Sequence, residues 1–374
     1  MFRSAHGEAP EWRDALDACI ANLGSLPALK EGSARLGFLY VTEPMAPRLG
    51  AIVETLRERT GVADWAGAAG MGIAGDEADY FEEAALAVMV ADVPAASYTL
   101  LPSPDALKRS VGALPRKGAF AGLPLLVLHG DSSNPKVLDM IEEAARESEG
   151  YLVGGLTMSR SPRHHVAGVV TDSGLSGVLF QPGVGVVTSL SQGCAPIGAA
   201  HTVTRAEDNY IFELDERRAL DVLKENIGEM LSRDLRRAAG YIHAALPIAG
   251  SDTGDYVVRN LVGVDEQHGI VAIAAEVETG ERLMFVSRDP NAAREDFRTM
   301  LAKLAARAQG KAQGALFISC IARGPNMFGE RGVELQMIRE ALGNVPLVGM
   351  YANGEIFNNR LYGYTGVLTL FTGE

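Results

Sequence analysis

The sequence predicts an α/β fold of two domains, each built around a mixed β-sheet flanked by helices. Three observations support this prediction. The chain has 374 residues, more than one ordinary domain, and 47% of them are apolar, which is enough for two cores. Apolar runs of strand length alternate with amphipathic stretches of helix length. One unit of strand, helix, strand and returning strand also recurs three times as a diverged repeat.

The first copy of the repeat occupies the start of the chain. Its expected strands are 36–42, 65–72 and 85–91, around a helix over 47–60. Pro47 suits a first helical turn because its missing N–H would be unbonded there, and Gly61 is a stop signal. The glycines Gly67, Gly70 and Gly72 follow a helix and lack the Gly-Lys-Ser of a phosphate loop. They are therefore expected to let neighbouring strands approach closely.

The other two copies have the same spacing. The second has strands 123–129, 151–157 and 177–180 around a helix over 135–148, with Gly150 as its stop signal. The third closes the chain, with strands 316–319, 347–352 and 363–371 around a helix over 333–342. The long glycine- and proline-broken segment 102–118, within the first half, is expected to be a loop.

A segment of different composition, residues 194–310, separates the second and third copies. Its expected helices are 217–239 and 291–309, and its expected strands are 256–264, 269–278 and 282–287. Gly280 is expected to turn the last two strands into a hairpin. Breaks at Pro182-Gly183 and Gln192-Gly193 place the domain boundary between 1–190 and 191–374.

Composition excludes several classes of function. The net charge is −13 without a block of basic residues, which argues against nucleic acid and anionic membranes as partners. Cys19, Cys194 and Cys320 lie far apart, with no CxxC pair, as in a reduced cytosolic chain without a structural zinc site. The N-terminus lacks a signal-peptide core, and no apolar run approaches about 18 residues. A cytoplasmic protein without membrane insertion is expected.

Several ordered motifs resemble the FIST family. Residues 191–198, 203–215 and 219–221 form one set, and Cys320-x-x-Arg323-Gly324, Gly349, 353–356 and 364–368 form another. Both sets resemble the FIST C-terminal domain. The first ~185 residues, with the turn at 153–155, resemble the FIST N-terminal domain. The resemblance thus implies a FIST N-terminal domain over 1–190 and a FIST C-terminal domain over 191–374, in a stand-alone bacterial form.

The resemblance implies a sensory module that binds a small ligand, with amino acids as proposed ligands, rather than a well-defined enzyme. It also implies an alternative, since one branch of the family is a haem-based nitric oxide sensor that acts beside a histidine kinase. The sequence departs from the family after the 153–155 turn, where a basic cluster with Arg160, Arg163, His164 and His165 replaces an acidic pair. A ligand bound there would differ in charge, and Arg160 is a candidate contact.

Four polar residues follow the ends of two adjacent predicted strands: Cys320, Arg323, Asn353 and Glu355. Open α/β sheets build ligand sites from such positions. Arg323 suits a carboxylate or phosphate, but it equally suits an ion pair with Glu330, Glu334 or Glu355. Glu355 would accept from a ligand ammonium or from backbone N–H groups.

Fewer chemical arguments support the remaining site candidates. Arg205 and Asn209 would line a site shared between the domains, and Cys194 suits a packing role. His164, His165 and His201 are candidate haem ligands, because haem needs one axial histidine and an apolar pocket. The adjacent His164-His165 pair is also typical of a solvated loop. His129 ends a buried strand.

The function that these features indicate is a non-enzymatic sensor of a small anionic or zwitterionic metabolite such as an amino acid. Arg323 would contact its carboxylate, and Glu355 or Asn353 its other polar end. The alternatives are a haem-binding nitric oxide sensor and an enzyme with Cys320 or Cys194 as nucleophile. A pure scaffold without a ligand is a further alternative. A sensor without an output domain would act through a signalling partner such as a histidine kinase, and the sequence is compatible with an oligomer.

Overall fold

The computed structural model describes residues 1–373 except 113–121, 173, 233–234, 236–239 and 249–253. The chain forms two compact units. Unit 1 comprises Met1–Ser191, Phe297–Leu361 and Thr365–Glu374, and unit 2 comprises Gln192–Asp296 and Tyr362–Tyr364. The predicted α/β fold in two parts is confirmed. The sequence domains 1–190 and 191–374 stay a prediction, and the compact units differ from them because the last segment of the chain belongs to unit 1.

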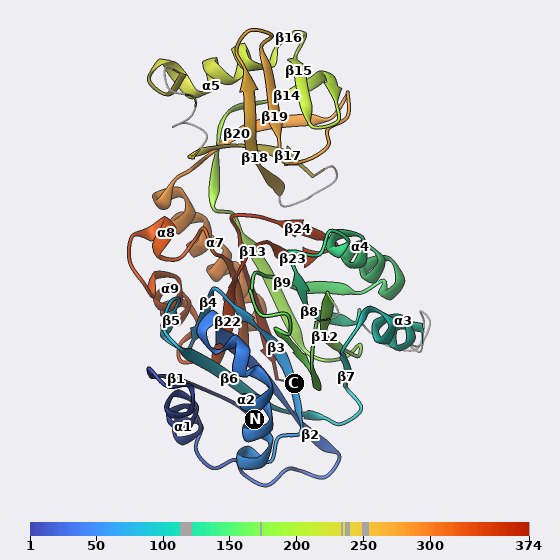
Figure 1. The fold of residues 1–374 in the computed structure, drawn as a ribbon, viewed down its shortest axis with the longest axis vertical. Coiled ribbons are helices and arrows are strands. Elements are labelled where there is room, and N and C mark those ends of the chain that lie inside the picture. The colour runs from blue at the N-terminus through green and yellow to red at the C-terminus, as the bar shows by residue number, and fades with distance from the viewer. Residues whose placement is uncertain (113–121, 173, 233–234, 236–239, 249–253, 374) are drawn as a thin grey trace. The chain divides into compact units, whose positions relative to one another are not determined.

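Unit 1 contains three six-stranded sheets with one common strand order (Figure 1). The first is β1 (Phe2–Glu8), β6 (Ala85–Pro94), β2 (Ser33–Thr42), β3 (Asp64–Gly70), β10 (His165–Ala167) and β11 (Val169–Thr171). The second is β7 (Tyr98–Leu101), β12 (Leu175–Phe180), β8 (Leu125–Asp131), β9 (Tyr151–Thr157), β23 (Glu355–Asn358) and β24 (Arg360–Tyr362). The third is β13 (Val186–Ser191), β25 (Gly366–Thr372), β21 (Ala312–Cys320), β22 (Leu347–Ala352), β4 (Gly72–Gly75) and β5 (Ala78–Tyr80).

The three predicted copies are therefore confirmed, and they are interlocked. In each sheet the first and second strands of one copy pair in parallel, and its returning strand pairs with the first strand in antiparallel. The last two strands of each sheet form a hairpin that comes from another copy. β4–β5 of the first copy joins the third sheet, β10–β11 of the second joins the first, and β23–β24 of the third joins the second. Each copy thus completes the sheet of a neighbour.

One glycine in each second strand permits this arrangement. These glycines pair with a bulky residue of the first strand: Gly67 with Leu39, Gly154 with Leu128 and Gly349 with Phe317. A Cβ atom there would lie 1.7, 1.9 or 1.7 Å from the carbonyl oxygen of that partner. No side chain fits at such a distance. The expectation that Gly67 allows close approach of strands is confirmed.

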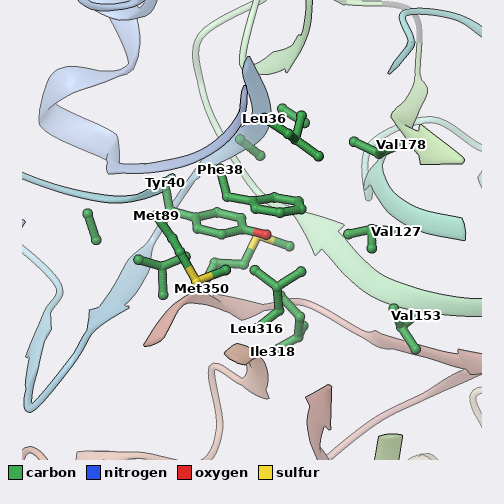
Figure 2. Packing of buried hydrophobic residues seen from close by; sticks show 14 of the residues in the cluster. Leu36, Phe38, Tyr40, Met89, Val127, Val153, Val178, Leu316, Ile318 and Met350 are labelled. Atoms are coloured by element: carbon green, nitrogen blue, oxygen red, sulfur yellow. The ribbon is translucent and has the colours of Figure 1, made fainter. Parts of the chain in front are cut away.

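Side chains from all three sheets meet in one apolar cluster inside unit 1. Figure 2 shows Phe38 and Tyr40 of β2 pointing toward residues of the other sheets, including Val127 and Leu316. The opposite face of each sheet packs against helices through separate clusters. These helices are α1 (Trp12–Leu23), η1 (Glu43–Arg48), α2 (Leu49–Thr60), α3 (Pro104–Gly112), α4 (Val137–Ser148), α7 (Pro290–Ala308), α8 (Pro325–Phe328) and α9 (Val333–Leu342). Unit 1 therefore has an inner strand core and outer helical layers.

Most helix predictions are confirmed, and two details are wrong. α2 ends at Gly61 in a left-handed conformation, as expected, whereas α4 ends at Glu149, which is itself left-handed, rather than at Gly150. The predicted loop 102–118 contains α3. The Ser103 hydroxyl accepts from the backbone N–H of Ala106 at its start, and its apolar residues reach the core. Residues 113–118 of that prediction lie outside the described residues.

Unit 2 is built on an antiparallel sheet, unlike the mixed sheet that was predicted. Its strands are β14 (Cys194–Glu207), β20 (Arg282–Arg288), β17 (Ile242–Pro247), β18 (Tyr256–Asp265), β19 (Ile270–Ile273), β15 (Tyr210–Leu214) and β16 (Arg217–Arg218). The order closes on itself, because β14 pairs with β20 through its first part and with β15 through its last part. The helix α5 (Ala219–Ser232) packs on this sheet, with Gly228 as a break. The rest of the helix predicted over 217–239 is mostly outside the described residues.

The predicted hairpin at Gly280 is wrong. β19 pairs with β15 and β18, whereas β20 pairs with β14 and β17. The N–H of Gly280 instead bonds to the carbonyl of Val203 in β14. Closure of the sheet through β14 thus separates two strands that are neighbours in sequence. Within the part of the chain that is described, no helix is both long and apolar enough to cross a membrane.

Unit 2 is an insertion in the third copy of the repeat. In the first copy Ala9–Glu11 connect β1 to α1, and in the second Pro102–Ser103 connect β7 to α3. In the third copy residues 192–289 lie between β13 and α7, at the same point of the repeat. The start of the insertion lies beside the helix that follows its end, since the N–H of Gln192 donates to Oδ2 of Asp296 in α7 at 2.7 Å. An insertion with adjacent ends interrupts its host without changing the fold.

We therefore expect unit 1 to fold without the insertion. Residues 193–289 would be replaced by a linker of about the length of Ala9–Glu11, and circular dichroism and thermal unfolding would be measured. A cooperative transition with retained strand signal is expected, because the three sheets and their helices are all kept. A chain that stays unfolded would show that unit 2 is needed for the three copies to assemble.

Candidate functional site

The carboxyl ends of β21 and β22 bring together three of the residues predicted to form a site. β21 and β22 run in parallel as neighbours, and Cys320 at the end of β21 pairs with Ala352. Glu355 follows the next turn as the first residue of β23. Arg323 and Glu355 have no solvent exposure, and Cys320 is 7% exposed. The polar groups at these strand ends are therefore inside the protein.

Arg323 forms a buried ion pair with Glu334 of α9. Its Nε donates to Glu334 Oε1 at 2.8 Å, and neither side chain is exposed. Glu334 Oε2 also accepts from the Ser319 hydroxyl at 3.1 Å and from the N–H of Gly324 at 3.2 Å. Of the predicted partners of Arg323, Glu334 is the one that forms this ion pair. The Nη1 and Nη2 atoms of Arg323 are buried and have no hydrogen-bond partner among the residues that the structure describes.

The guanidinium group of Arg323 lies among aromatic rings. Its Cζ atom is 5.5 Å from the ring centre of Phe297 and 5.6 Å from that of Phe328. Gly366 lies on another side, where an added Cβ would be 3.5 Å from Arg323 Nε and from the ring of Phe317. Aromatic rings thus cover part of the buried guanidinium group, and burial strengthens any electrostatic contact made there.

Glu355 is held by the residue that precedes β25. Its Oε2 accepts from the N–H of Thr365 at 3.1 Å and from the Thr365 hydroxyl at 2.8 Å. Its Oε1 is buried and accepts from no N–H or O–H group of the described residues, while the Cys320 thiol forms a hydrogen bond with this carboxyl group. Burial raises the pKa of Glu355 to about 8, against the opposing effects of Thr365, the Cys320 thiol and the Arg323 charge. The carboxyl group is therefore largely protonated at neutral pH.

The sequence did not predict that Tyr351 and Asp79 lie next to this group. Tyr351 donates to Asp79 Oδ2 at 3.0 Å, and the same oxygen accepts from the N–H of Gly332 at 2.9 Å. Burial raises the pKa of Tyr351, and the nearby Glu334 and Asp79 charges add to this effect. Asp79 comes from the hairpin that the first copy donates to the third sheet. Only the strand exchange brings it here, and no local pattern in the sequence indicates it.

Two other predicted ligand contacts in unit 1 do not join this group, and the two in unit 2 stay a prediction. Asn353 is exposed, and its N–H bonds to the carbonyl of Leu156. Arg160 is exposed, and its N–H donates to Glu43. Arg205 and Asn209 belong to unit 2. There Arg205 pairs with Glu213 at 3.5 Å, and the Asn209 amide donates to the carbonyl of Ile273.

The histidines are more buried than their loop position suggests. His164 is 3% exposed and His165 is not exposed, so the interpretation of a solvated pair is wrong. His165 lies beside the Thr157 hydroxyl at 3.0 Å, and burial lowers its pKa well below the usual value. His129 lies 3.0 Å from the Tyr40 hydroxyl, and burial lowers its pKa to about 4. Both histidines are neutral in the folded protein.

Haem ligation stays a prediction. His201 has both ring nitrogens engaged, with Asp215 at 2.7 Å and the Asn226 amide at 3.1 Å. A haem ligand needs a free nitrogen, so His201 would first have to lose one of these partners. Among the residues that the structure describes, no three His, Cys, Asp or Glu side chains are grouped to hold a metal ion. Cys19, Cys194 and Cys320 are buried thiols that form no disulfide.

A pocket of about 260 Å³ lies elsewhere in unit 1. It is near the amino end of β22, at Leu347, and its polar lining includes Ser4, Asp76, Arg339 and Asn344. Asp76 already accepts from Ser4 at 2.5 Å and from the N–H of Leu347 at 3.1 Å. Because these polar atoms have partners, the pocket is a weaker site candidate than the group around Arg323 and Glu355.

Loss of the Glu334 charge should destabilise unit 1. In Glu334→Gln, Arg323 would keep a hydrogen-bond acceptor but lose its counter-charge, and a buried unpaired charge costs about 3–5 kcal/mol. Urea unfolding would measure the free energy of unfolding. The control is Glu340→Gln on the same helix, an exposed glutamate that accepts from the side chain of Gln336. A loss in Glu334→Gln no larger than in the control would contradict the role of this ion pair.

The protonated state of Glu355 predicts a pH dependence of stability. A carboxyl whose folded pKa is raised from 4.5 to about 8 contributes stability that is complete below pH 4.5 and is lost as the pH rises through 8. Glu355→Gln lacks this ionisation. The variant should gain stability relative to wild type between pH 5 and pH 8.5, at about 1.4 kcal/mol per unit of pKa shift. Equal pH profiles for the two proteins would show that Glu355 is ionised when folded.

Comparison with known proteins gives two domain matches. The FIST N domain model matches residues 35–217 and the FIST C domain model matches residues 219–358. An uncharacterised protein of Mycobacterium bovis, Mb0898c, is 38% identical over 214 residues, which are 55% of each chain. The uncharacterised protein MT0656 of Mycobacterium tuberculosis is 37% identical over 216 residues, which are 54% of this chain and 55% of the relative. The chain thus matches about half the length of these curated relatives.

Proposed function

Because the chain belongs to the FIST family, we propose that it is a sensory protein whose buried group around Arg323 and Glu355 binds a small metabolite. FIST domains are generally regarded as sensory domains that bind small ligands. The ligand is anionic or zwitterionic, as an amino acid is, and its occupancy is passed to a signalling partner such as a histidine kinase. Arg323 contacts the carboxylate of the ligand.

One observation carries this proposal. In the described part of the chain, Arg323 Nη1, Arg323 Nη2 and Glu355 Oε1 are buried polar atoms that pair with no nitrogen or oxygen atom. Such atoms are rare in folded proteins, because each one costs about 1–3 kcal/mol. The atoms belong to one group, since the Arg323 charge acts on Glu355 and both side chains lie against residues 365–366. A carboxylate that accepted from both Nη atoms in a bidentate pair would remove most of this cost.

The position of the group supports the same proposal. It lies at the carboxyl ends of two parallel strands, which is where α/β sheets bind ligands. Glu334 holds the guanidinium through Nε and leaves the two Nη atoms for another partner. The aromatic rings of Phe297 and Phe328 pack beside the guanidinium group. Arg323 is therefore oriented before a ligand arrives, which lowers the entropy cost of binding.

Replacement of Arg323 should abolish most of the binding. Native mass spectrometry of freshly purified protein would first identify a retained small molecule, and titration calorimetry would then measure its affinity. Arg323→Gln keeps a donor for Glu334 but loses the charged fork, and a cost of about 2–4 kcal/mol in binding is expected. Arg331→Gln removes a half-exposed arginine on the segment after α8 and serves as the control.

Arg323→Gln and Glu355→Gln together distinguish a loss of binding from a loss of folding. Arg323→Gln with wild-type affinity would refute the proposed contact. If Arg323→Gln does not fold, Glu355→Gln gives a second measurement, because it changes a neighbouring residue of the same group with little change in shape. Equal affinities in wild type and in all three variants would place the ligand elsewhere.

A further inference from the structure

We infer that residues 362–365 form a strained strap, and that the release of Tyr364 from its contacts in unit 2 opens the buried group around Arg323 and Glu355. This inference rests on the proposed function for the ligand that the opening admits, and it adds the device that controls access. Arg323, Glu355 and Thr365 have no solvent exposure. A ligand therefore reaches this group after a covering segment has moved.

Thr365 is the end of the strap that belongs to unit 1. Its N–H and its hydroxyl both donate to Glu355 Oε2, at 3.1 and 2.8 Å. Its carbonyl accepts from the N–H of Cys320 at 2.9 Å. The next residue, Gly366, lies beside the guanidinium group, since a Cβ added there would be 3.5 Å from Arg323 Nε. Movement of Thr365 would therefore uncover a carboxyl oxygen of Glu355 and the backbone of Cys320.

Tyr364 is held by unit 2, to which its contacts assign it. Its hydroxyl donates to Asn260 Oδ1 at 2.7 Å. Its ring stacks on that of His243, with ring centres 4.5 Å apart, and its centre lies 5.8 Å from Cζ of Arg288. Neither ring nitrogen of His243 forms a hydrogen bond with the described residues, so this contact is one of ring packing. Two consecutive residues, Tyr364 and Thr365, are thus held by different units.

The backbone of Tyr364 is strained. Its φ is 63°, in the left-handed region that bulky side chains rarely adopt. A residue stays in such a conformation where the surrounding contacts hold it there. Once the tyrosine ring is released, the backbone relaxes to negative φ. This rotation redirects the chain at Thr365, which then loses the geometry of its three hydrogen bonds.

The strap opens from its unit 2 end. Asn260 is exposed, so water or a bound molecule competes for the hydroxyl of Tyr364. The hydrogen bonds of Thr365 to Glu355 are buried, and burial makes such bonds costly to break one by one. Release of Tyr364 is therefore the first step, and the departure of Thr365 follows from the relaxed backbone. The state of unit 2 thereby controls access to a group in unit 1.

Cys320 is a reporter of this opening, because it is buried and its N–H bonds to Thr365. Each protein would be treated with iodoacetamide at a fixed pH without ligand, and peptide mass spectrometry would give the alkylation rate at each cysteine. Asn260→Ala removes the acceptor of the Tyr364 hydroxyl. Its Cys320 should react about fivefold faster than in wild type, the factor that one neutral hydrogen bond contributes to an equilibrium. The rate at Cys19, which is buried in the cluster against α1, should stay unchanged.

Two further variants separate the strap from general instability. Tyr364→Phe keeps the ring and should match Asn260→Ala. The double variant should react no faster than either, because both changes remove the same hydrogen bond. Asn226→Ala is the matched control, since it removes an amide that contacts His201 elsewhere in unit 2. It should leave the rate at Cys320 at the wild-type value.

The strain is tested at residue 364 itself. Tyr364→Ala and Tyr364→Gly both lose the ring and its hydroxyl, but glycine adopts positive φ without the steric cost that alanine has. Cys320 should therefore react severalfold faster in Tyr364→Ala than in Tyr364→Gly. Equal rates in these two variants would overturn the strained strap.

The remaining outcomes separate this inference from the proposed function. Wild-type rates at Cys320 in both Asn260→Ala and Tyr364→Phe would overturn the inference, and so would an equal increase at Cys320 and Cys19, which reports global unfolding. These results leave Arg323 as a ligand contact untouched, because no ligand is present. An absence of any bound small molecule in native mass spectra would count against the proposed function, while the alkylation rates would still confirm or refute the strap.

Discussion

The structure of unit 1 depends on the close approach of strands at three glycines. Gly67, Gly154 and Gly349 each lie between the first strand of their own copy and the hairpin that another copy donates. A side chain at any of them would collide with a carbonyl oxygen less than 2 Å away. Without these glycines the first and second strands could not pair in register, and the donated hairpin would have no strand to extend. The cyclic exchange of hairpins therefore rests on three positions without a side chain.

This exchange also explains how distant residues reach the candidate site. Glu355 belongs to the third copy, yet it extends the sheet of the second, and Asp79 belongs to the first copy, yet it extends the sheet of the third. The carboxyl end of β21 is thus enclosed by parts of different copies. Enclosure on all sides is what buries Arg323 completely and makes its pairing with Glu334 necessary. Burial strengthens the electrostatic interactions of such a site, but it also restricts the access of a ligand from solvent.

The sequence predicts the parts of this architecture better than their assembly. Apolar runs, prolines and glycines locate most strands and helices of unit 1, because these signals are local. They also place Cys320, Arg323 and Glu355 at strand ends. The exchange of hairpins is not predictable in this way, since it depends on pairing across more than 70 residues in sequence. For the same reason Asp79 was missed, and the burial of His164 and His165 contradicts the solvated loop that their neighbours indicate.

The repeat further shows that equivalent positions of one scaffold carry side chains of different chemistry. Glu355, His165 and Ile73 occupy equivalent positions, because each pairs with the residue that follows the glycine of a second strand. All three are buried, but one is a carboxyl group, one an imidazole and one a hydrocarbon. Only the carboxyl group lies near a buried arginine with free donors. Three copies of one scaffold therefore carry three different side chains at this position, and the described residues place the carboxyl group of the third copy beside a buried arginine.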